Sequence, residues 1–272
     1  MNEPAADLHV HTLYSDGMLS PAEVVAEAQR IALAAIAITD HDTTDGIAPG
    51  IEAARSAGIL IIPGIEINTD WVGKEIHILG YGFDIANTKL LLRLEWIKTE
   101  RIQRIERIIS RLQALGLSIA IERVFEIAGR GTVGRPHVGM AMVEKGYVGN
   151  ISEAFTQYLA MGRAAYVPRY NITPEEAVQL ILQAGGIPVL AHPGLINKDE
   201  LIPDLIRFGL KGIEVYYPTH TVEQIDKYFR LAQKLNLVVT GGSDFHGEAN
   251  TYRDQLGAIT VQLRTLQNIK FE

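Results

Sequence analysis

The chain of 272 residues and 29.9 kDa is long enough for one large α/β domain, or for one domain with an insertion. It has no cysteine, which excludes disulfides and cysteine-ligated zinc or iron–sulfur sites. The formal net charge of −7 argues against a broad electrostatic grip on duplex nucleic acid, but it does not exclude small phosphate ligands. The chain shows no signal peptide and no apolar run of the roughly 20 residues that span a bilayer, so we expect a soluble cytoplasmic protein.

The first part of the chain alternates short apolar runs with amphipathic helical patterns. A helix is expected to begin after Ser20, because Pro21 follows this N-cap residue and Glu23 places an acid in the first turn. A second helix is expected over 44–57, where Gly58 ends it. The apolar runs predict strands at 8–11, 35–39, 59–63 and 75–83.

The pattern changes in the middle of the chain. A long helical segment rich in Glu, Arg, Leu and Ile runs from about 87 to 115. Further helical stretches reach about residue 161, and no strong strand pattern occurs among them. We therefore predict a helical insertion over 84–164, inside a discontinuous α/β domain formed by 1–83 and 165–272.

The alternation resumes after the insertion. Thr173 and Pro174 repeat the helix-start chemistry, and helices are predicted at 199–208 and 221–235. Strands are predicted at 187–191, 212–216 and 237–240. Repeated βα units indicate a parallel sheet, either open or closed into a barrel. In both architectures ligands gather at the carboxyl ends of the strands.

Six of the eight histidines stand in short clusters beside carboxylates, and most of these clusters follow or close an apolar run. Imidazole and carboxylate without thiolate form the ligand set of borderline to hard transition metals. The clusters are Asp7-Leu8-His9-Val10-His11, Thr39-Asp40-His41-Asp42, Glu75-Ile76-His77, Leu190-Ala191-His192-Pro193 and Ser243-Asp244-Phe245-His246. Strand-end placement that recurs so often is hard to obtain without a shared site, so we predict a metal centre.

Taken singly, each piece also has a structural explanation. His9 and His11 share one strand face, but such a pair can occur by chance. Asp16 lies in a turn sequence, and His77 alone could be a hydrogen-bonded core histidine. Together, the candidates are too many for one ion, so two or three ions with a bridging carboxylate are expected. The candidate ligands are His9, His11, Asp16, His41, Glu66, His77, His192, Asp244 and His246.

These motifs resemble the PHP (polymerase and histidinol phosphatase) family of metal-dependent phosphoesterases. The matching segments are D-L-H-V-H-T with Ser15-Asp16-Gly17, T-D-H-D, P-G-I-E, His77, A-H-P-G and G-S-D-F-H, and they cover 6–83 and about 165–260. The resemblance implies a distorted (β/α)7 barrel with a trinuclear site on its carboxyl face.

The resemblance also implies a ligand set for each ion. One ion would be held by His9, His11, Glu66 and Asp244. A second would take Glu66 as a bridge, with His77 and His192. The third would take Asp16, His41 and His246. No ligand position is missing from this chain, so we expect an active enzyme.

The insertion resembles the nucleotide phosphatase and 5′→3′ exoribonuclease branch of the family, in which a small helical domain caps the site. Arg135 and His137 match its R-x-H element, and an arginine fork suits a phosphate bidentately. Arg135 could also be a surface residue, and His137 a helix cap. Arg169 is a weaker phosphate candidate. His220 is a candidate general acid, or only a cap for the helix at 221.

We therefore expect a hydrolase of phosphate esters on nucleotides, either a 3′,5′-bisphosphate nucleotide phosphatase or a 5′→3′ exonuclease on short RNA. A metal-bridging hydroxide would attack phosphorus in line, with Asp16, Glu66, Asp244 and His220 in the catalytic set. Mn²⁺ is expected from the resemblance, although Fe, Zn, Co or Mg would suit the same ligands. The alternatives are a histidinol-phosphate type phosphatase and a non-catalytic metal-binding module. The oligomeric state is not indicated.

Overall fold

The computed structural model describes residues 4–129, 131–168, 172–247 and 255–266. The chain divides into two compact units, one formed by Met1–Leu92 with Ile172–Glu272 and the other by Arg93–Asn171. The first carries the sheet and all the motif residues singled out above except those at 130–169.

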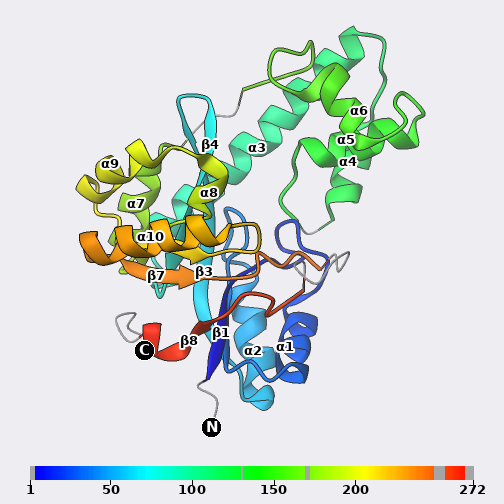
Figure 1. The fold of residues 1–272 in the computed structure, drawn as a ribbon. Coiled ribbons are helices and arrows are strands. Elements are labelled where there is room, and N and C mark those ends of the chain that lie inside the picture. Colours follow the sequence, from blue (N-terminus) through cyan, green and yellow to red (C-terminus); the bar gives the residue numbers. More distant parts are fainter. Residues whose placement is uncertain (1–3, 130, 169–171, 248–254, 267–272) are drawn as a thin grey trace. The chain divides into compact units, whose positions relative to one another are not determined.

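The first unit is built on an eight-stranded sheet with the order β7-β6-β5-β4-β3-β2-β1-β8 (Figure 1). An isolated parallel bridge between Val10 and Phe245 brings the segment after β7 back to the end of β1, so the sheet forms a nearly closed barrel. The strands are β1 (Ala5–Val10), β2 (Ala35–Ile38), β3 (Leu60–Trp71), β4 (Lys74–Tyr81), β5 (Ile187–Leu190), β6 (Gly212–Tyr216), β7 (Val238–Gly241) and β8 (Val261–Gln262). The predicted α/β barrel is confirmed, and the seven predicted strands correspond to β1–β7.

Two strands depart from the parallel arrangement expected from repeated βα units, the short β8, which pairs antiparallel with β1, and β4. β4 pairs antiparallel with both β3 and β5. No helix connects β3 to β4, because Val72 and Gly73 both adopt left-handed conformations (φ 51° and 78°) and close a two-residue hairpin. In this hairpin Asn68 pairs with His77, so His77 enters the barrel from inside a strand rather than from a strand end.

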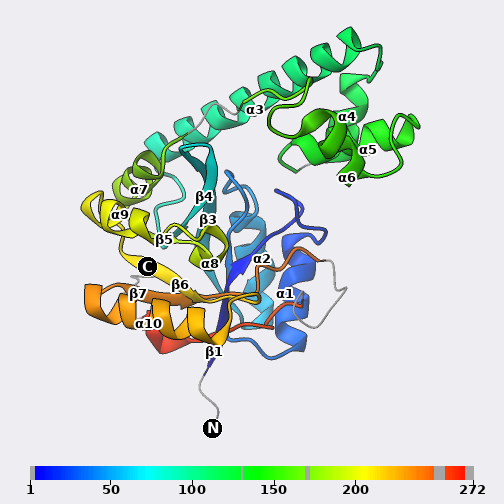
Figure 2. The same ribbon diagram turned by 45° about the horizontal axis from the view of Figure 1, so that its top comes forward.

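Helices cover the outside of the sheet, as the views in Figures 1 and 2 agree. Ser20, Thr173 and Thr221 each cap a helix with a side-chain oxygen and complete a capping box, as the sequence indicates at the first two positions. The helices are α1 (Pro21–Arg30), α2 (Ile47–Ala57), α7 (Pro174–Gln183), α8 (Pro193–Ile196), α9 (Ile202–Arg207) and α10 (Val222–Leu235), with short 3-10 turns at Asp199–Leu201 and Leu263–Leu266.

Two apolar clusters fix the sheet of the first unit. One gathers Leu8, Ile62, Leu79 and Val189 from four strands. The other packs α1 and α2 against the sheet through residues such as Val24. Because these side chains are fully or almost fully buried, the strand ends that carry polar groups are held in fixed positions.

The second unit is helical over its described residues, 93–129 and 131–168, which contain no strand. α3 (Thr88–Ala114) begins in the first unit and crosses the boundary. It is followed by α4 (Ile121–Ala128), α5 (Arg135–Glu144), α6 (Ile151–Ala154) and a π-helical turn at Phe155–Leu159. Ile108, Leu112, Val138 and Met142 form the centre of its apolar core.

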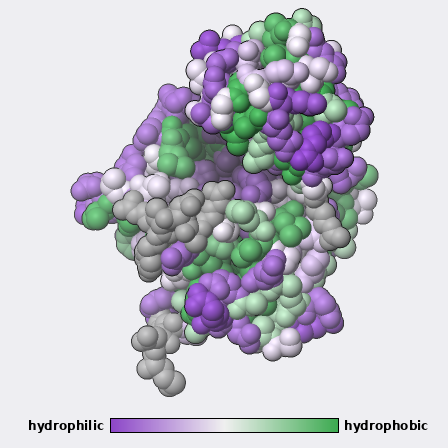
Figure 3. Space-filling view, turned by 90° about the vertical axis from the view of Figure 1, so that its right-hand side faces the viewer, coloured by the Kyte–Doolittle hydropathy of each residue, from purple (hydrophilic) through white to green (hydrophobic). Residues whose placement is uncertain are grey.

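The face shown in Figure 3 mixes hydrophobic and hydrophilic residues. The most exposed large apolar side chains, Val72, Val222, Leu92 and Met161, come from separate parts of the sequence. Within the described parts of the chain, no helix combines the length and apolar character needed to cross a membrane.

Candidate metal centre

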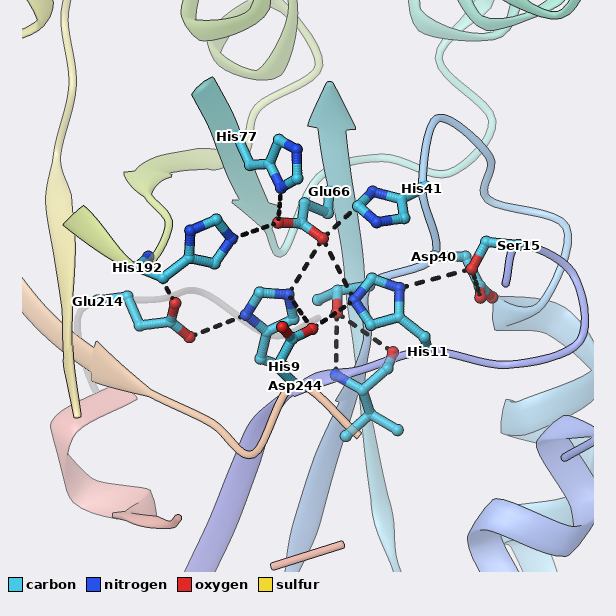
Figure 4. A network of polar contacts seen from close by, with 12 residues as sticks. His9, His11, Ser15, Asp40, His41, Glu66, His77, His192, Glu214 and Asp244 are labelled. Carbon is cyan, nitrogen blue, oxygen red and sulfur yellow. Dashed lines mark hydrogen bonds and ion pairs between the residues drawn. The ribbon is translucent and has the colours of Figure 1, made fainter. Parts of the chain in front are cut away.

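Glu66 is the centre of the site, and five imidazoles point at its carboxylate (Figure 4). Oε2 lies 3.1 Å from His9 Nε2, 3.2 Å from His11 Nε2 and 3.2 Å from His41 Nδ1. Oε1 lies 2.8 Å from His77 Nδ1 and 3.1 Å from His192 Nε2. The side chain of Glu66 is only 1% exposed, so a single buried carboxylate connects five histidines from four segments of the barrel.

The strand ends explain how residues so distant in sequence meet. His9 lies in β1 and His11 directly follows it, so the two rings share one face. His41 and His192 follow β2 and β5, and Asp244 follows β7. His192 (φ 26°) and Asp244 (φ 52°) both have positive φ, so the chain turns sharply where each ligand projects.

A second carboxylate, that of Asp16, lies near His246 and two of the histidines already described. Its oxygens lie 3.3 Å from His246 Nε2, 3.7 Å from His41 Nε2 and 3.7 Å from His11 Nδ1. The loop that carries Asp16 is held by the buried Asp40. The Asp40 carboxylate accepts hydrogen bonds from the Thr12 amide and hydroxyl, each at 2.7 Å, and from the Ser15 hydroxyl at 2.6 Å.

The donor atoms suit metal ions. Three sets each place one ligand atom per residue within 4.8 Å of the others. His11 Nε2 lies 3.0 Å from Asp244 Oδ1 and 3.2 Å from Glu66 Oε2, yet among the described residues no partner makes a well-directed hydrogen bond to it. A bound cation would satisfy this crowded set of lone pairs. The sets are His9, His11, Glu66 and Asp244; His11, Asp16, His41 and His246; and His41, Glu66 and His77.

Burial and the neighbouring carboxylates shift the pKa values of the histidines in opposite directions. Burial alone would lower the pKa of His11, but the Asp244 and Glu66 carboxylates outweigh it and raise that pKa to about 10. Burial would also lower the pKa of His77, but the Glu66 and Glu75 carboxylates raise it to about 10. For His41 burial prevails and lowers the pKa to about 4. Burial opposes ionisation of Glu66, but the surrounding histidines hold its pKa well below the usual range.

Metal affinity should therefore rise with pH. A ligand histidine must be deprotonated, and the pKa of about 10 for His11 and His77 means that both carry a displaceable proton at neutral pH. Each displaced proton should strengthen apparent binding by about tenfold per pH unit below that pKa. Chelator-competition titrations with Mn²⁺ between about pH 6 and about pH 9 would measure the slope. A flat profile would contradict this account of the centre.

His220 lies beside the centre but is bonded on both ring nitrogens. Its Nδ1–H donates to the Val215 carbonyl at 2.9 Å, and its Nε2 accepts from the Gly194 amide at 3.1 Å. The ring therefore joins the end of β6 to the turn after His192, and Thr221 is the residue that caps α10. In this geometry the ring has no free N–H to give to a leaving group, so its role as an acid stays a prediction.

The phosphate-binding candidates belong to the second unit. Arg135 donates from Nη1 to the Leu159 carbonyl at 3.2 Å, and its guanidinium lies 5.3 Å from the centre of the Phe155 ring and 5.9 Å from that of Tyr166. His137 Nδ1 accepts from the Gly134 amide at 3.0 Å, which is the capping contact. Arg169 lies outside the described residues. Phosphate binding by these three residues stays a prediction.

Sequence reasoning missed two residues that touch the ligands. Glu214 in β6 contacts His9 and the backbone of His192, and Tyr217 donates to Asp244 at 2.8 Å. A signal for Glu214 was present, because an acid inside the apolar strand Gly212–Tyr216 must have a buried partner. Tyr217 gave no comparable signal.

Comparison with known proteins supplies the family. A family model described as PHP domain matches residues 7–121. A 3′,5′-nucleoside bisphosphate phosphatase of Chromobacterium violaceum is 34% identical over 91% of this chain and 89% of its own length. The 5′-3′ exoribonuclease Rnm of Escherichia coli is 36% identical over 88% of this chain and 84% of its own. A phosphoribosyl 1,2-cyclic phosphate 1,2-diphosphodiesterase of Eggerthella lenta is 32% identical over 89% and 94%.

Solved structures agree with the relatives. A protein from Bifidobacterium adolescentis, assigned as a metal-dependent phosphoesterase, has a TM-score of 0.85 and 30% identity over 98% of this chain and 96% of that one. A Chromobacterium violaceum protein described as an amidohydrolase, solved with bound sulfate and without metal, has a TM-score of 0.80 and 32% identity over 94% and 90%. Similarity across nearly the whole chain, with the ligand motifs in place, shows that the chain belongs to the PHP family.

Proposed function

We propose that this chain is a metal-dependent phosphoesterase that hydrolyses phosphate esters of nucleotides. The observation that carries the proposal is the convergence of five imidazoles on the Glu66 carboxylate, beside a second cluster at Asp16. Such a set holds several divalent ions close together, which is the arrangement that suits phosphoryl transfer. The named activities of the relatives support phosphate esters as the substrate class.

The proposed centre holds three ions, for which Mn²⁺ is our first expectation. His9, His11, Glu66 and Asp244 would hold one. Glu66, His77 and His192 would share the second, and Asp16, His41 and His246 the third. When bound, the ions supply an activated hydroxide and neutralise charge on the phosphate oxygens.

Two carboxylates of the chain, those of Glu66 and Asp16, would have different roles at the centre. Glu66 would bridge two ions, because its two oxygens face different groups of histidines. Asp16 is 45% exposed, far more than Glu66, so the Asp16 cluster is the side of the centre that meets solvent and substrate. Neither carboxylate needs to form a covalent bond to the substrate.

The nucleotide assignment rests on the relatives and on the second unit. By name, one relative is a phosphatase of 3′,5′-nucleoside bisphosphates and another is a 5′-3′ exoribonuclease, which acts on RNA. We propose that the helical unit is a substrate-binding cap and that Arg135 binds a second phosphate of the substrate. Stable binding of duplex nucleic acid is not part of the proposal, given the net charge of −7.

A substrate comparison tests the proposal. The Mn²⁺-loaded protein should release phosphate from adenosine 3′,5′-bisphosphate, or mononucleotides from a 5′-phosphorylated RNA oligomer. Arg135→Ala should lower kcat/KM about 10- to 100-fold, because a charged hydrogen bond contributes about 1.5–3 kcal/mol. Arg135→Lys should recover only part, since lysine keeps the charge without the fork. Activity on both substrates that is unaffected by Arg135→Ala would remove this residue from the substrate site.

Two alternatives make different predictions. A histidinol-phosphate type phosphatase would hydrolyse small amino-alcohol or sugar phosphates far better than nucleotides. A non-catalytic binding module would hydrolyse nothing. Hydrolysis of p-nitrophenyl phosphate that is lost on chelation and restored by Mn²⁺ would exclude the second alternative. Activity on histidinol phosphate well above that on the two nucleotide substrates would favour the first.

A further inference from the structure

We propose that Glu214 and Tyr217 are positioning residues that fix three metal ligands from three separate segments of the barrel. The inference rests on the metal centre of the proposed function and adds the residues that orient it. Glu214 lies in β6 and Tyr217 follows directly after that strand. Neither is one of the nine candidate ligands.

Glu214 determines which nitrogen of His9 faces the metal. Its Oε1 lies 2.9 Å from His9 Nδ1, and both side chains are completely buried. An ionised carboxylate can only accept, so His9 Nδ1 must carry the hydrogen. His9 Nε2, which lies 3.1 Å from Glu66 Oε2 and 3.3 Å from Asp244 Oδ1, is then the nitrogen that would face the metal. A carboxylate behind a ligand histidine fixes its tautomer and ring orientation in this way.

The other oxygen of Glu214 holds the turn that carries His192. Oε2 accepts from the His192 backbone N–H at 2.8 Å. This N–H belongs to a residue with φ 26° and ψ 58°, a conformation that a non-glycine residue adopts only when its surroundings impose it. The His192 ring then lies with Nε2 3.1 Å from Glu66 Oε1. One carboxylate thus ties β1 to the turn after β5.

Tyr217 orients the Asp244 carboxylate. Its hydroxyl donates to Asp244 Oδ2 at 2.8 Å, and this leaves Oδ1 facing the imidazoles, 3.0 Å from His11 Nε2. Asp244 also has a positive φ of 52°, so this hydrogen bond orients a side chain at a sharp turn of the chain. Tyr217 is 9% exposed and its ring packs against that of His192, with centroids 5.2 Å apart.

The Glu214→Gln variant distinguishes a positioning role of Glu214 from a role in packing alone. Glutamine has nearly the same shape, but its amide offers one acceptor and one donor where two donors must be met. If the amide nitrogen faces His9, the ring must move its hydrogen to Nε2 and lose its metal-facing lone pair. If the nitrogen faces His192, two N–H groups oppose each other. Either orientation impairs one ligand without creating a cavity.

The test measures Mn²⁺ binding itself, by competition with a chelating dye and by metal content, on the full chain. Glu214→Gln should weaken binding about 10- to 100-fold and Tyr217→Phe about tenfold. Tyr228→Phe is the matched control, because it also removes a buried tyrosine hydroxyl bonded to a carboxylate, here Asp199 at 3.1 Å, and should change affinity less than about twofold. Thermal unfolding of the metal-free proteins should shift similarly for the two tyrosine variants.

The outcomes separate this inference from the proposed function. Wild type and both variants binding Mn²⁺ with equal affinity would overturn the positioning role while leaving the metal centre intact. A wild type that binds no divalent ion would overturn the proposed function and this inference together. Should Glu214→Gln fail to fold, a selective loss of affinity in Tyr217→Phe relative to Tyr228→Phe would still support positioning, and equal affinities would overturn it.

Discussion

Replacing Glu66 with glutamine should release the two ions that Glu66 would share and lower turnover at least about 1,000-fold, equivalent to roughly 4 kcal/mol of lost transition-state stabilisation. The change keeps the shape of the side chain but removes its negative charge. Five imidazoles then surround a neutral amide whose NH₂ group competes with them as a donor. Both oxygens of Glu66 face ligand histidines, so the amide would leave one group of them without a carboxylate oxygen.

Metal content after dialysis against Mn²⁺, together with hydrolysis of p-nitrophenyl phosphate, would measure this effect. Glu27→Gln is a suitable control, because Glu27 is a carboxylate on α1 that pairs with Arg30 at 2.6 Å and lies in no ligand set. The control should retain full metal content and activity. A Glu66→Gln protein that kept both would show that the bridging role is wrong.

Gly242→Ala should be the most damaging small substitution near the centre. A Cβ at this position would lie 2.4 Å from the backbone nitrogen of His9 and 2.4 Å from His9 Cβ. Backbone cannot move aside as a flexible side chain can, so either β1 or the segment leading to Asp244 must shift. We expect a loss of about 3 kcal/mol, or about 10 °C in the midpoint of thermal unfolding, with loss of bound metal.

Gly149→Ala provides the comparison in the second unit. The added Cβ would meet only the end of the Glu153 side chain, at 3.1 Å, and Gly149 does not have positive φ. Its unfolding midpoint should remain within about 2 °C of wild type. Near-normal stability and metal content in Gly242→Ala would show that β1 and the Asp244 segment are less tightly apposed than their contact implies.

Local sequence signals predicted much of this structure because they depend on neighbouring residues. Ser20 and Thr173 mark helix starts through their own backbone contacts, and apolar runs mark each of the seven main strands. Ligand residues at strand ends were predictable once the strands were known, since parallel strands present the same end. His77 reached the site by another route, the hairpin closed at Val72 and Gly73, which periodicity alone did not reveal.

Contacts between distant side chains were not predictable in this way. Glu214 and Tyr217 act on groups from other strands, and nothing within their own segment encodes those partners. His220 gave a reactive residue type in a suitable place, yet tertiary contacts at Val215 and Gly194 bond both of its nitrogens. For Arg135 and His137, the sequence located the start of α5 but could not assign a role to the side chains.

The closure of the barrel between β1 and the segment after β7 has a consequence for folding. Apart from the Val10–Phe245 bridge, this closure is held by a few long-range contacts, among them those of Asp7 with the Ser243 amide and hydroxyl. Asp7 and Ser243 are separated by 236 positions, so the barrel closes only after most of the chain has been ordered. His9 and His11 belong to the β1 side of this closure, and Asp244 belongs to the segment after β7. An ion bound by ligands from both segments would slow the separation of β1 from the segment after β7. Metal occupancy would then help to determine the unfolding rate.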